Sequence, residues 1–233
     1  MKTAFITGGT KGIGYGVAES LLSEGYAVAV TGRTEPGVQD AVEALSRNFE
    51  GRVLGLVADV RDLASLEKAV AATVETFGGV DVVIANAGVG IFKSIEHLTA
   101  EDWAHTLDTN LTGVFYTVKA ALDEVVRRKG YIITISSLAG TNFFEKGTAY
   151  NASKFGLVGF TQALMLDVRD KDVKVSTIMP GSVATYFNNH VPSDTDAWKI
   201  QPEDIGQMVV DLLRMNPRTL PSKIEVRPAR VRK

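Results

Sequence analysis

Short hydrophobic segments rich in β-branched residues recur along the chain, and longer stretches with apolar residues at helical spacing separate them. Six such segments span residues 3–7, 27–31, 52–57, 80–85, 131–136 and 173–179. They are apolar at nearly every position, which is typical of strands in a parallel sheet covered by helices on both faces. The pattern therefore predicts alternating strands and helices in a doubly wound α/β fold.

A seventh short strand is predicted near the end of the chain, in the segment KIEVR, residues 223–227. With it the sheet becomes Rossmann-like, mainly parallel and seven-stranded, with helices on both faces. No internal repeat, low-complexity tract or Pro/Gly-rich linker divides the 233 residues, which suffice for one sizeable core. We therefore expect a single domain, residues 1–233, that carries both a cofactor site and a substrate site.

Composition disfavours several classes of protein. The net charge of -2 offers no positive surface for nucleic acid, and the basic end PARVRK is too short to change that. The chain has no Cys, and His97, His105 and His190 lack metal-ligand spacing, so no disulfide or metal site is expected. The apolar runs are much shorter than the roughly 20 residues that a membrane-spanning helix needs, and no signal-peptide pattern is present. We expect a cytoplasmic protein without a membrane or nucleic-acid partner.

A short polar or glycine-containing motif follows each of the first six predicted strands. In chain order these motifs are TGGTKGIG, GR, DV, NAG, SS and PG. In doubly wound sheets, ligands bind outside the carboxyl ends of the strands, where the strand order reverses. Six motifs at equivalent ends of six strands therefore predict one ligand site at this edge, and together they are more specific than any one of them.

The glycine-rich segment after the first strand is predicted to receive the pyrophosphate of a dinucleotide. Its glycines permit a tight turn, and it opens a helix whose N-terminal amides can bind an anion. The candidate contacts are Gly8, Thr10, Lys11, Gly12, Ile13 and Gly14. A turn used only for packing is the alternative. A P-loop is excluded, because a P-loop needs Gly-Lys-Ser/Thr where this chain has lysine before glycine.

Arg33 follows the second predicted strand and indicates which dinucleotide binds. A site for NAD places an acidic residue there, to accept hydrogen bonds from the ribose 2′-hydroxyl. A guanidinium group instead suits a 2′-phosphate, and Lys11 can add a second positive charge. The cofactor is therefore predicted to be NADP(H). The alternative is that both cations are solvated surface charges, partly neutralised by Glu35.

The segment YNASK places Tyr150 and Lys154 four residues apart. On a helix these positions share a face, so the ammonium group would lie near the phenol. A nearby positive charge favours the phenolate and is expected to lower the pKa of Tyr150 from its usual value of about 10. An ordinary surface pair at this spacing is the alternative, and the motif alone does not decide between them.

Taken together, these motifs closely resemble those of the short-chain dehydrogenases/reductases, in their single-domain branch. The match covers nearly the whole chain, in the family's order and spacing, at Thr7-Gly8…Gly12-x-Gly14, Asp59-Val60, Asn86-Ala87-Gly88, Asn110, Ser137, Tyr150…Lys154 and Pro180-Gly181 with Thr185 beyond. Ala85 departs from the second asparagine that is frequent in the family, which is a mild change.

The resemblance implies four catalytic residues. Tyr150 would exchange a proton with the substrate oxygen as a general acid-base. Lys154 would lower the pKa of this tyrosine and bind the nicotinamide ribose. Ser137 would stabilise charge on the substrate oxygen, and Asn110 would hold a water of a proton relay that leads from Lys154 to solvent.

The resemblance also implies cofactor contacts beyond the glycine-rich segment. These are Asp59, Val60, Asn86, Ala87, Gly88, Tyr150, Lys154, Pro180, Gly181, Val183 and Thr185. The pair at 59–60 would contact adenine, the triplet at 86–88 would pack against the cofactor, and the segment 180–185 would shape the nicotinamide pocket.

The expected function is that of an NADP(H)-dependent oxidoreductase that interconverts a carbonyl compound and a secondary alcohol by hydride transfer. A catalytically silent NADP(H)-binding regulator is the alternative, and the complete Ser-Tyr-Lys set argues against it. A nucleotide-sugar epimerase or dehydratase would need a C-terminal domain that the chain lacks. The resemblance further implies a homo-oligomer, either a tetramer or a dimer.

The substrate is not determined at this level, and acyl-thioester, small-ketone, sugar and steroid-like substrates all remain open. Candidates for an apolar substrate pocket are Val89, Leu138, Phe143, Phe144, Val183 and Phe187. The aromatic members could equally belong to the core or to subunit contacts. Between Thr185 and the next predicted helix only residues 186–200 can cover the site, which predicts an open cleft.

Overall fold

The computed structural model describes residues 1–230, and residues 231–233 of the basic C-terminal segment lie outside the described residues. Seven strands form one sheet in the order β3-β2-β1-β4-β5-β6-β7, and every neighbouring pair is parallel. The strands are β1 (Thr3–Thr7), β2 (Ala27–Gly32), β3 (Val53–Val57), β4 (Val82–Ala85), β5 (Tyr131–Ile135), β6 (Lys174–Pro180) and β7 (Lys223–Val226). The predicted doubly wound, seven-stranded sheet is confirmed.

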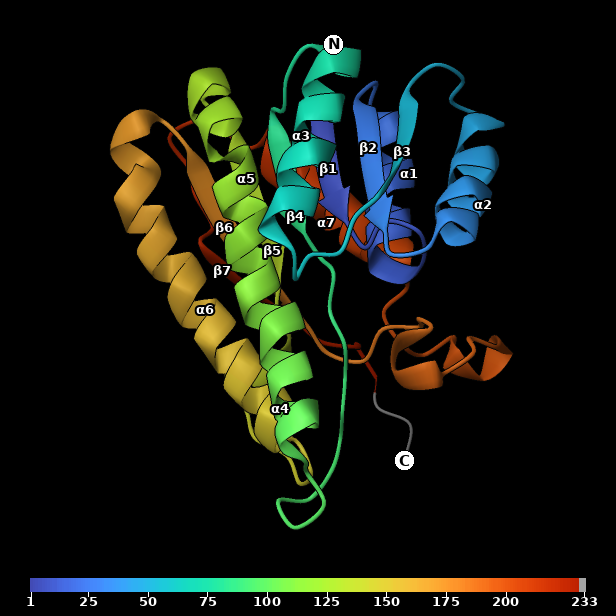
Figure 1. Ribbon diagram of the computed structural model, residues 1–233, viewed down its shortest axis with the longest axis vertical. Helices are drawn as coiled ribbons and strands as arrows, with labels where there is room; N and C mark the ends of the chain where they lie inside the picture. The colour runs from blue at the N-terminus through green and yellow to red at the C-terminus, as the bar shows by residue number, and fades with distance from the viewer. Residues whose placement is uncertain (231–233) are drawn as a thin grey trace.

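The longer helices are α1 (Gly12–Ser23), α2 (Glu35–Ser46), α3 (Leu63–Phe77), α4 (Ala100–Leu107), α5 (Gly113–Arg128), α6 (Thr148–Val168) and α7 (Pro202–Arg214). Short helical turns are η1 (Asp108–Thr112, π-helical), η2 (Leu138–Gly140), η3 (Arg169–Lys171), η4 (Phe187–Asn189) and η5 (Asp194–Asp196). One face of the sheet is covered by α3, α5 and α6, which stand in front of the strands in Figure 1, and the other by α1, α2 and α7.

Two hydrophobic clusters fill the space between the sheet and its helices, one on each face. The central strands β1, β4 and β5 are buried at every position, which explains their uninterrupted apolar sequences. Local signals define the helix ends. Asp62 accepts a hydrogen bond from the Ala64 amide at the start of α3, and Thr99 and Asp102 form a capping box at the start of α4.

The strand order reverses between β1 and β4, so the chain leaves these two neighbouring strands toward opposite faces of the sheet. Such a reversal opens a crevice at the carboxyl ends of the strands. The glycine-rich segment after β1 and the Asn86 segment after β4 both reach this crevice. In residues 1–230, none of the helices combines the length and apolar character that crossing a bilayer requires.

Candidate active site

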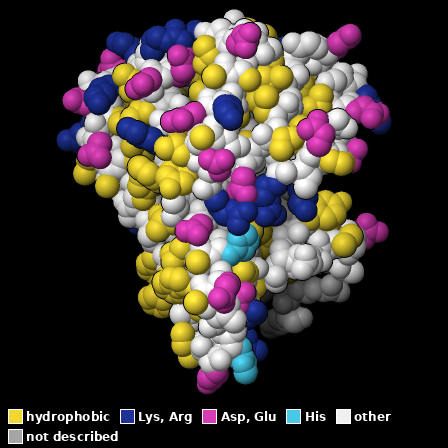
Figure 2. Space-filling model, in the orientation of Figure 1, with side chains coloured by type: hydrophobic (Ala, Val, Ile, Leu, Met, Phe, Trp, Pro, Cys, Tyr) yellow, Lys and Arg dark blue, Asp and Glu magenta, His cyan; other side chains and the backbone are white. Residues whose placement is uncertain are grey.

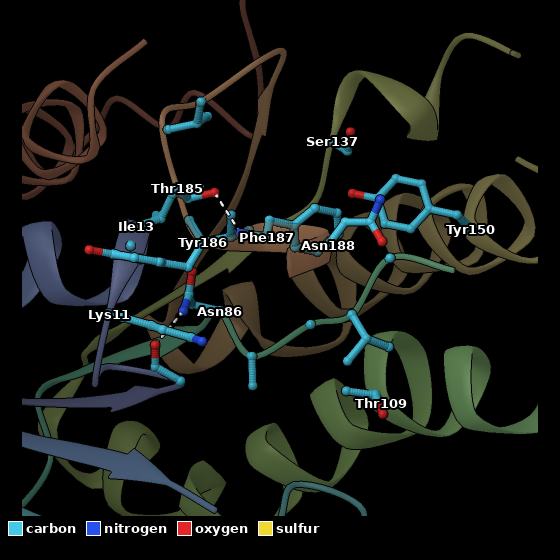
Figure 3. A pocket seen from close by; sticks show the side chains of 18 of the residues that line it. Lys11, Ile13, Asn86, Thr109, Ser137, Tyr150, Thr185, Tyr186, Phe187 and Asn188 are labelled. Carbon is cyan, nitrogen blue, oxygen red and sulfur yellow. Dashed lines mark hydrogen bonds between the residues drawn. The ribbon is translucent and has the colours of Figure 1, made fainter. Parts of the chain in front are cut away.

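A cavity of about 1190 Å³ lies at the carboxyl ends of the strands. Segments that follow β1 to β6 all contribute to its wall. Figure 3 shows Lys11 and Ile13 on one side of this cavity, Ser137 and Tyr150 on the other, and the segment from Thr185 to Asn188 between them. The polar motifs that are scattered along the sequence therefore meet at one site.

The glycine-rich segment forms the turn between β1 and α1. Gly8 (φ 65°) and Gly12 (φ 58°) adopt left-handed backbone conformations, which glycine tolerates at little cost. Asn86, which follows β4, ties this turn in place, because its side-chain amide donates to the carbonyl oxygens of Thr7 and Gly8 at 3.0 Å each. The segment after β1 is therefore held open at the N-terminus of α1.

One of the predicted glycine contacts does not reach the cavity. Among the described residues, the wall includes Gly8, Thr10, Lys11, Gly12 and Ile13 but not Gly14. A Cβ atom added to Gly14 would lie 2.4 Å from the Gly8 carbonyl oxygen. We therefore interpret Gly14 as a packing residue that lets α1 begin close to the turn.

Positive charge gathers at the end of the cavity below β2 and β3, where Figure 2 shows Lys and Arg side chains grouped beside a His. Arg33 is exposed and lines this end of the cavity. Within residues 1–230, Glu35 forms no ion pair with it, and the Glu35 carboxylate accepts a hydrogen bond from Gln39. Lys11 lies toward the other side, with its Nζ 5.7 Å from the centre of the Tyr186 ring.

Asp59 is bound to a residue that the sequence analysis did not single out. Arg61 donates to both carboxylate oxygens of Asp59, from Nε at 3.0 Å and from Nη2 at 2.6 Å. This hydrogen bonding holds the pKa of Asp59 below its usual value. Arg61 is therefore bound to Asp59, and Arg33 is the cation of this region that is not. Val60, the next residue, lines the cavity as predicted.

Two hydroxyl groups in the cavity wall have no hydrogen-bond partner in the part of the chain that the structure describes. They belong to Thr31, near the end of β2, and to Thr109, in the π-helical turn η1, which Figure 3 labels. Buried hydroxyl groups are normally satisfied, because an unpaired one costs roughly 1–3 kcal/mol. Both hydroxyl oxygens are buried, and neither belongs to a motif that would have revealed it from sequence.

Ser137, Tyr150 and Lys154 come together at the opposite end of the cavity. Tyr150 lies in the first turn of α6 and Lys154 one turn later, with the lysine Nζ 5.7 Å from the centre of the tyrosine ring. The Lys154 ammonium donates to the carbonyl oxygen of Ile135 at 3.1 Å. Ser137 follows β5, and its hydroxyl group acts to lower the pKa of Tyr150. Helical spacing and the end of β5 thus place all three groups together.

The expectation that Lys154 lowers the pKa of Tyr150 is wrong for the protein by itself. Burial raises the pKa of Tyr150 to about 12, and the Ser137 hydroxyl group offsets this only in part. Burial also lowers the pKa of Lys154 to about 8. Low polarity penalises the charged form of both groups, so burial and not the spacing of the two residues sets the direction of each shift.

Asn110 is completely buried and contributes no atom to the described cavity wall. Its Oδ1 accepts from the Val89 amide at 2.8 Å, and its Nδ2 donates to the Val89 carbonyl oxygen at 2.9 Å and to the Ser153 hydroxyl at 3.1 Å. The side chain therefore fastens the segment after β4 to α6. That Asn110 holds a water of a proton relay stays a prediction. Because its side chain makes these three bonds, its main-chain groups would have to bind that water.

The remaining predicted cofactor residues all lie in the cavity wall: Val60, Asn86, Ala87, Gly88, Pro180, Gly181, Val183 and Thr185. Ala87 and Gly88 follow β4 directly, and Pro180 and Gly181 mark the end of β6. A Cβ atom added to Gly12 would lie 3.2 Å from the Thr185 side chain, so the segments after β1 and β6 approach one another closely here.

Comparison with known proteins decides the family. A model described as "short chain dehydrogenase" matches residues 2–196. The chain belongs to the short-chain dehydrogenase family. An uncharacterized oxidoreductase of Staphylococcus saprophyticus is 31% identical over 232 residues, 97% of each chain. A 3-oxoacyl-[acyl-carrier-protein] reductase of Vibrio cholerae is 34% identical over 185 residues, 79% of this chain and 74% of the relative.

The solved structures include an alcohol dehydrogenase of the archaeon Thermococcus sibiricus in complex with 5-hydroxy-NADP. It is 30% identical, with a TM-score of 0.92, and the match covers 100% of this chain and 99% of that one. This short-chain dehydrogenase therefore shares both the sequence motifs and the whole backbone architecture of the family.

The apolar residues expected in the substrate pocket divide into two groups. Val89, Leu138, Phe144, Val183 and Phe187 line the cavity of this short-chain dehydrogenase. Phe143 does not, since its ring stacks on Phe155 with 5.1 Å between centres and 1° between planes. Phe92 lines the cavity but was not anticipated, because it lies outside every motif.

The cleft is less open at Tyr150 than the short segment after Thr185 suggests. Phe187 lies with its ring centre 5.8 Å from that of Tyr150, and only 8% of Tyr150 is exposed. The segment can cover the site because Asp196 anchors it, accepting from His190 Nε2 at 2.5 Å and from Lys199 Nζ at 2.6 Å. The expectation of an open cleft therefore fails at the tyrosine end.

Proposed function

We propose that the protein is an NADP(H)-dependent oxidoreductase that interconverts a carbonyl compound and a secondary alcohol. The observation that carries the proposal is that Ser137, Tyr150 and Lys154 meet at one end of a cavity whose other end contains Arg33. The archaeal relative is described as an alcohol dehydrogenase complexed with 5-hydroxy-NADP, which supports both the reaction class and the cofactor.

The cavity wall fits a dinucleotide phosphate. The first turn of α1 opens into the cavity, and the N-cap residue Lys11 makes no side-chain capping bond, so nearby backbone amides are free to bind a pyrophosphate. Arg33 would hold the 2′-phosphate, which suits a guanidinium group.

Bound NADPH would supply the hydride that adds to the carbonyl carbon and would itself be oxidised to NADP+. The Tyr150 hydroxyl donates its proton to the substrate oxygen, which becomes the alcohol oxygen. Ser137 donates a hydrogen bond to the same oxygen and stabilises the charge that develops there. The pKa of about 12 keeps Tyr150 protonated at neutral pH, as a proton donor must be. Oxidation of the alcohol runs these steps in reverse.

A screen of carbonyl compounds with the purified protein tests this proposal. We expect the absorbance of NADPH to fall in the presence of at least one class among acyl thioesters, small ketones, sugars and steroid-like ketones. The matched control omits the protein. Tight NADPH binding without oxidation by any class would contradict the proposal and would favour a catalytically silent nucleotide-binding protein.

A further inference from the structure

Three phenylalanine rings surround Tyr150. The ring centres of Phe92, Phe187 and Phe144 lie 5.2, 5.8 and 6.3 Å from that of Tyr150. Phe92 also lies 5.5 Å from Phe144 and 6.3 Å from Phe187, so the rings form one connected group. These separations fall within the range in which aromatic rings attract one another edge to face or offset.

The three rings come from different parts of the chain. Phe92 follows β4, Phe144 lies between η2 and α6, and Phe187 belongs to the segment between β6 and α7, where Figure 3 shows it beside Asn188 on the path to Tyr150. All three line the cavity. The tertiary fold therefore gathers an aromatic wall around the hydroxyl group that is proposed to transfer the proton.

Two glycines make room for these rings. A Cβ atom at Gly90 would lie 2.4 Å from Phe187, and one at Gly147 would lie 2.8 Å from Phe144. Both separations are far below ordinary contact distance, so a larger residue at either glycine would push its ring away. The backbone thus seats the rings close to the reaction centre.

The rings are more exposed than core phenylalanines. Phe144 is 45% exposed and Phe187 36%, whereas Phe5 in β1 is completely buried. An aromatic wall that is only half-covered retains apolar surface for a ligand, and burying this surface is favourable. If the rings served only to hold the segment between β6 and α7 in place, we would expect them to be buried against one another.

The basic side chains of the covering segment, residues 186–200, are already paired. Lys199 and His190 both line the cavity, and both bind the Asp196 carboxylate. The remaining Lys and Arg side chains of the cavity wall are Lys11, Arg33 and Arg61, on the proposed cofactor side, and Lys154, which donates to the carbonyl oxygen of Ile135. Arg61 is itself paired with Asp59. An anionic group on the substrate would therefore meet only basic side chains that are already engaged or that belong to the proposed cofactor side, which favours an uncharged substrate.

We propose that the substrate is an uncharged ketone that carries an aromatic ring next to its carbonyl group, with the ring held by Phe92, Phe144 and Phe187. This inference rests on the proposed function and adds the substrate class to it. Asn188, beside Phe187 in the cavity wall, offers an amide to a polar substituent on that ring.

Three methyl ketones with eight carbon atoms each test the substrate class: acetophenone, cyclohexyl methyl ketone and hexyl methyl ketone. They differ in whether the second group is aromatic, cyclic or linear. With saturating NADPH we expect kcat/KM to be highest for acetophenone, roughly tenfold above hexyl methyl ketone, since several aromatic contacts add to simple burial. Equal or lower kcat/KM for acetophenone would overturn the inference.

Variants separate recognition of the ring from the intrinsic reactivity of the ketone. When kcat/KM of a variant is divided by kcat/KM of the wild type for the same ketone, the reactivity of that ketone cancels. Phe144→Leu and Phe187→Leu keep apolar bulk but remove an aromatic ring, and each is expected to lower the acetophenone preference by roughly threefold to tenfold. Phe143→Leu is the matched control, since its ring stacks on Phe155 outside the cavity, and its preference should equal that of the wild type. Turnover with an unchanged preference in both cavity variants would overturn the substrate class while leaving the proposed function standing.

Saturation-transfer NMR on the NADP+-loaded protein provides a readout that does not need turnover. We expect saturation to pass from the protein to the ring protons of acetophenone, and to weaken in Phe187→Leu but not in Phe143→Leu. No transfer to the ring in the wild type would overturn the inference. Ring binding without oxidation of NADPH by any ketone would instead contradict the proposed function and retain the aromatic subsite.

Discussion

The Lys154 ammonium group is buried, and its surroundings make the charged form unfavourable. Its pKa is about 8 in the folded protein against 10.5 in the unfolded chain. Between these values the unfolded chain binds the proton more tightly, so stability rises with pH. The free-energy cost of burying the charged ammonium group is complete below pH 8 and has disappeared above pH 10.5. Lys154 therefore destabilises the protein at neutral pH. Its presence is explained by a role in function and not by a contribution to folding.

Lys154→Met removes the titrating group and keeps the length of the side chain. We expect the free energy of unfolding of the wild type to increase relative to this variant by about 2 kcal/mol between about pH 7.5 and pH 9.5. Urea unfolding at both pH values measures the difference. Lys68→Met, at an exposed position on α3, is the control for general effects of lysine removal. Parallel stability curves for the wild type and Lys154→Met would contradict the proposed burial penalty.

Tyr150→Phe removes the phenolic hydroxyl and keeps the ring that packs against the phenylalanine wall. If Tyr150 transfers the proton, kcat for ketone reduction should fall by roughly 10²-fold to 10⁴-fold, the usual contribution of general acid-base catalysis. Thermal melting should show a folded protein. Tyr131→Phe is the matched control, because that buried hydroxyl bonds only with Ser176 among the described residues and lies outside the cavity wall. A folded Tyr150→Phe enzyme with near wild-type kcat would exclude the proposed proton transfer.

Arg33→Asp reverses the charge at the position proposed to hold the 2′-phosphate. We expect the wild type to prefer NADPH over NADH by at least about tenfold, and the variant to lose or reverse this preference. The measurement is kcat/KM for each cofactor. Arg47→Asp, near the far end of α2, changes the net charge equally and should leave the preference intact. Equal efficiency of the wild type with both cofactors would rule out the assigned role of Arg33.

At the scale of elements, the segment between β6 and α7 depends on Asp196 for its position. Besides His190 and Lys199, the backbone amide of Ser193 donates to this carboxylate at 3.2 Å. Hydrogen bonds from Lys199 and His190 lower the pKa of Asp196 to about 2. The ionised Asp196 carboxylate contributes fully to the stability of the folded protein above its unfolded pKa of 3.8, and this contribution is lost as the pH falls through about 2. Its ion pairs therefore hold the segment in place at neutral pH.

Asp196→Asn should loosen this segment without unfolding the sheet. We expect faster proteolytic cleavage within residues 186–200 and a higher KM for the ketone, because Phe187 loses its fixed position beside Tyr150. Mass spectrometry of the fragments locates the cleavage. Asp194→Asn is the matched control, as Asp194 is exposed in the same turn and forms no ion pair within residues 1–230. Identical cleavage patterns in the two variants would argue against the anchoring role.

At the scale of the whole molecule, apolar side chains are exposed along α5 and α6. Phe115, Phe155 and Leu166 project from these helices, and a small groove between them is lined in part by Phe115 and Phe160. Apolar surface of this kind on long helices favours association between copies of the chain. We propose a homo-oligomer, either a tetramer or a dimer, in which α5 and α6 form one of the interfaces.

Phe115→Glu places a charge on this surface and should shift the protein to a smaller species in sedimentation velocity at micromolar concentration. Burying an unpaired carboxylate in an interface is unfavourable. Val57→Glu is the control, since Val57 is comparably exposed but lies at the end of the edge strand β3. A monomeric wild type at the same concentration would contradict the proposed assembly.

The sequence by itself determined the order of the elements, because an apolar run such as residues 131–136 or 173–179 has few ways to bury both faces other than as a central parallel strand. It also determined which motifs meet. Parallel strands end at one edge of a sheet, so Gly12, Asn86 and Ser137 could be assigned to one site without coordinates, whereas Tyr150 was assigned to it by the family resemblance.

Only the tertiary structure decided which side chains face the cavity and how their charges are balanced. Phe143 and Phe144 are neighbours of the same type, yet one stacks outward on Phe155 and the other lines the cavity. Phe92 and Arg61 carry no motif, and their positions depend on contacts with segments far along the chain. The pKa of Tyr150 depended in the same way on burial, a property of all its neighbours together, and not on its spacing from Lys154.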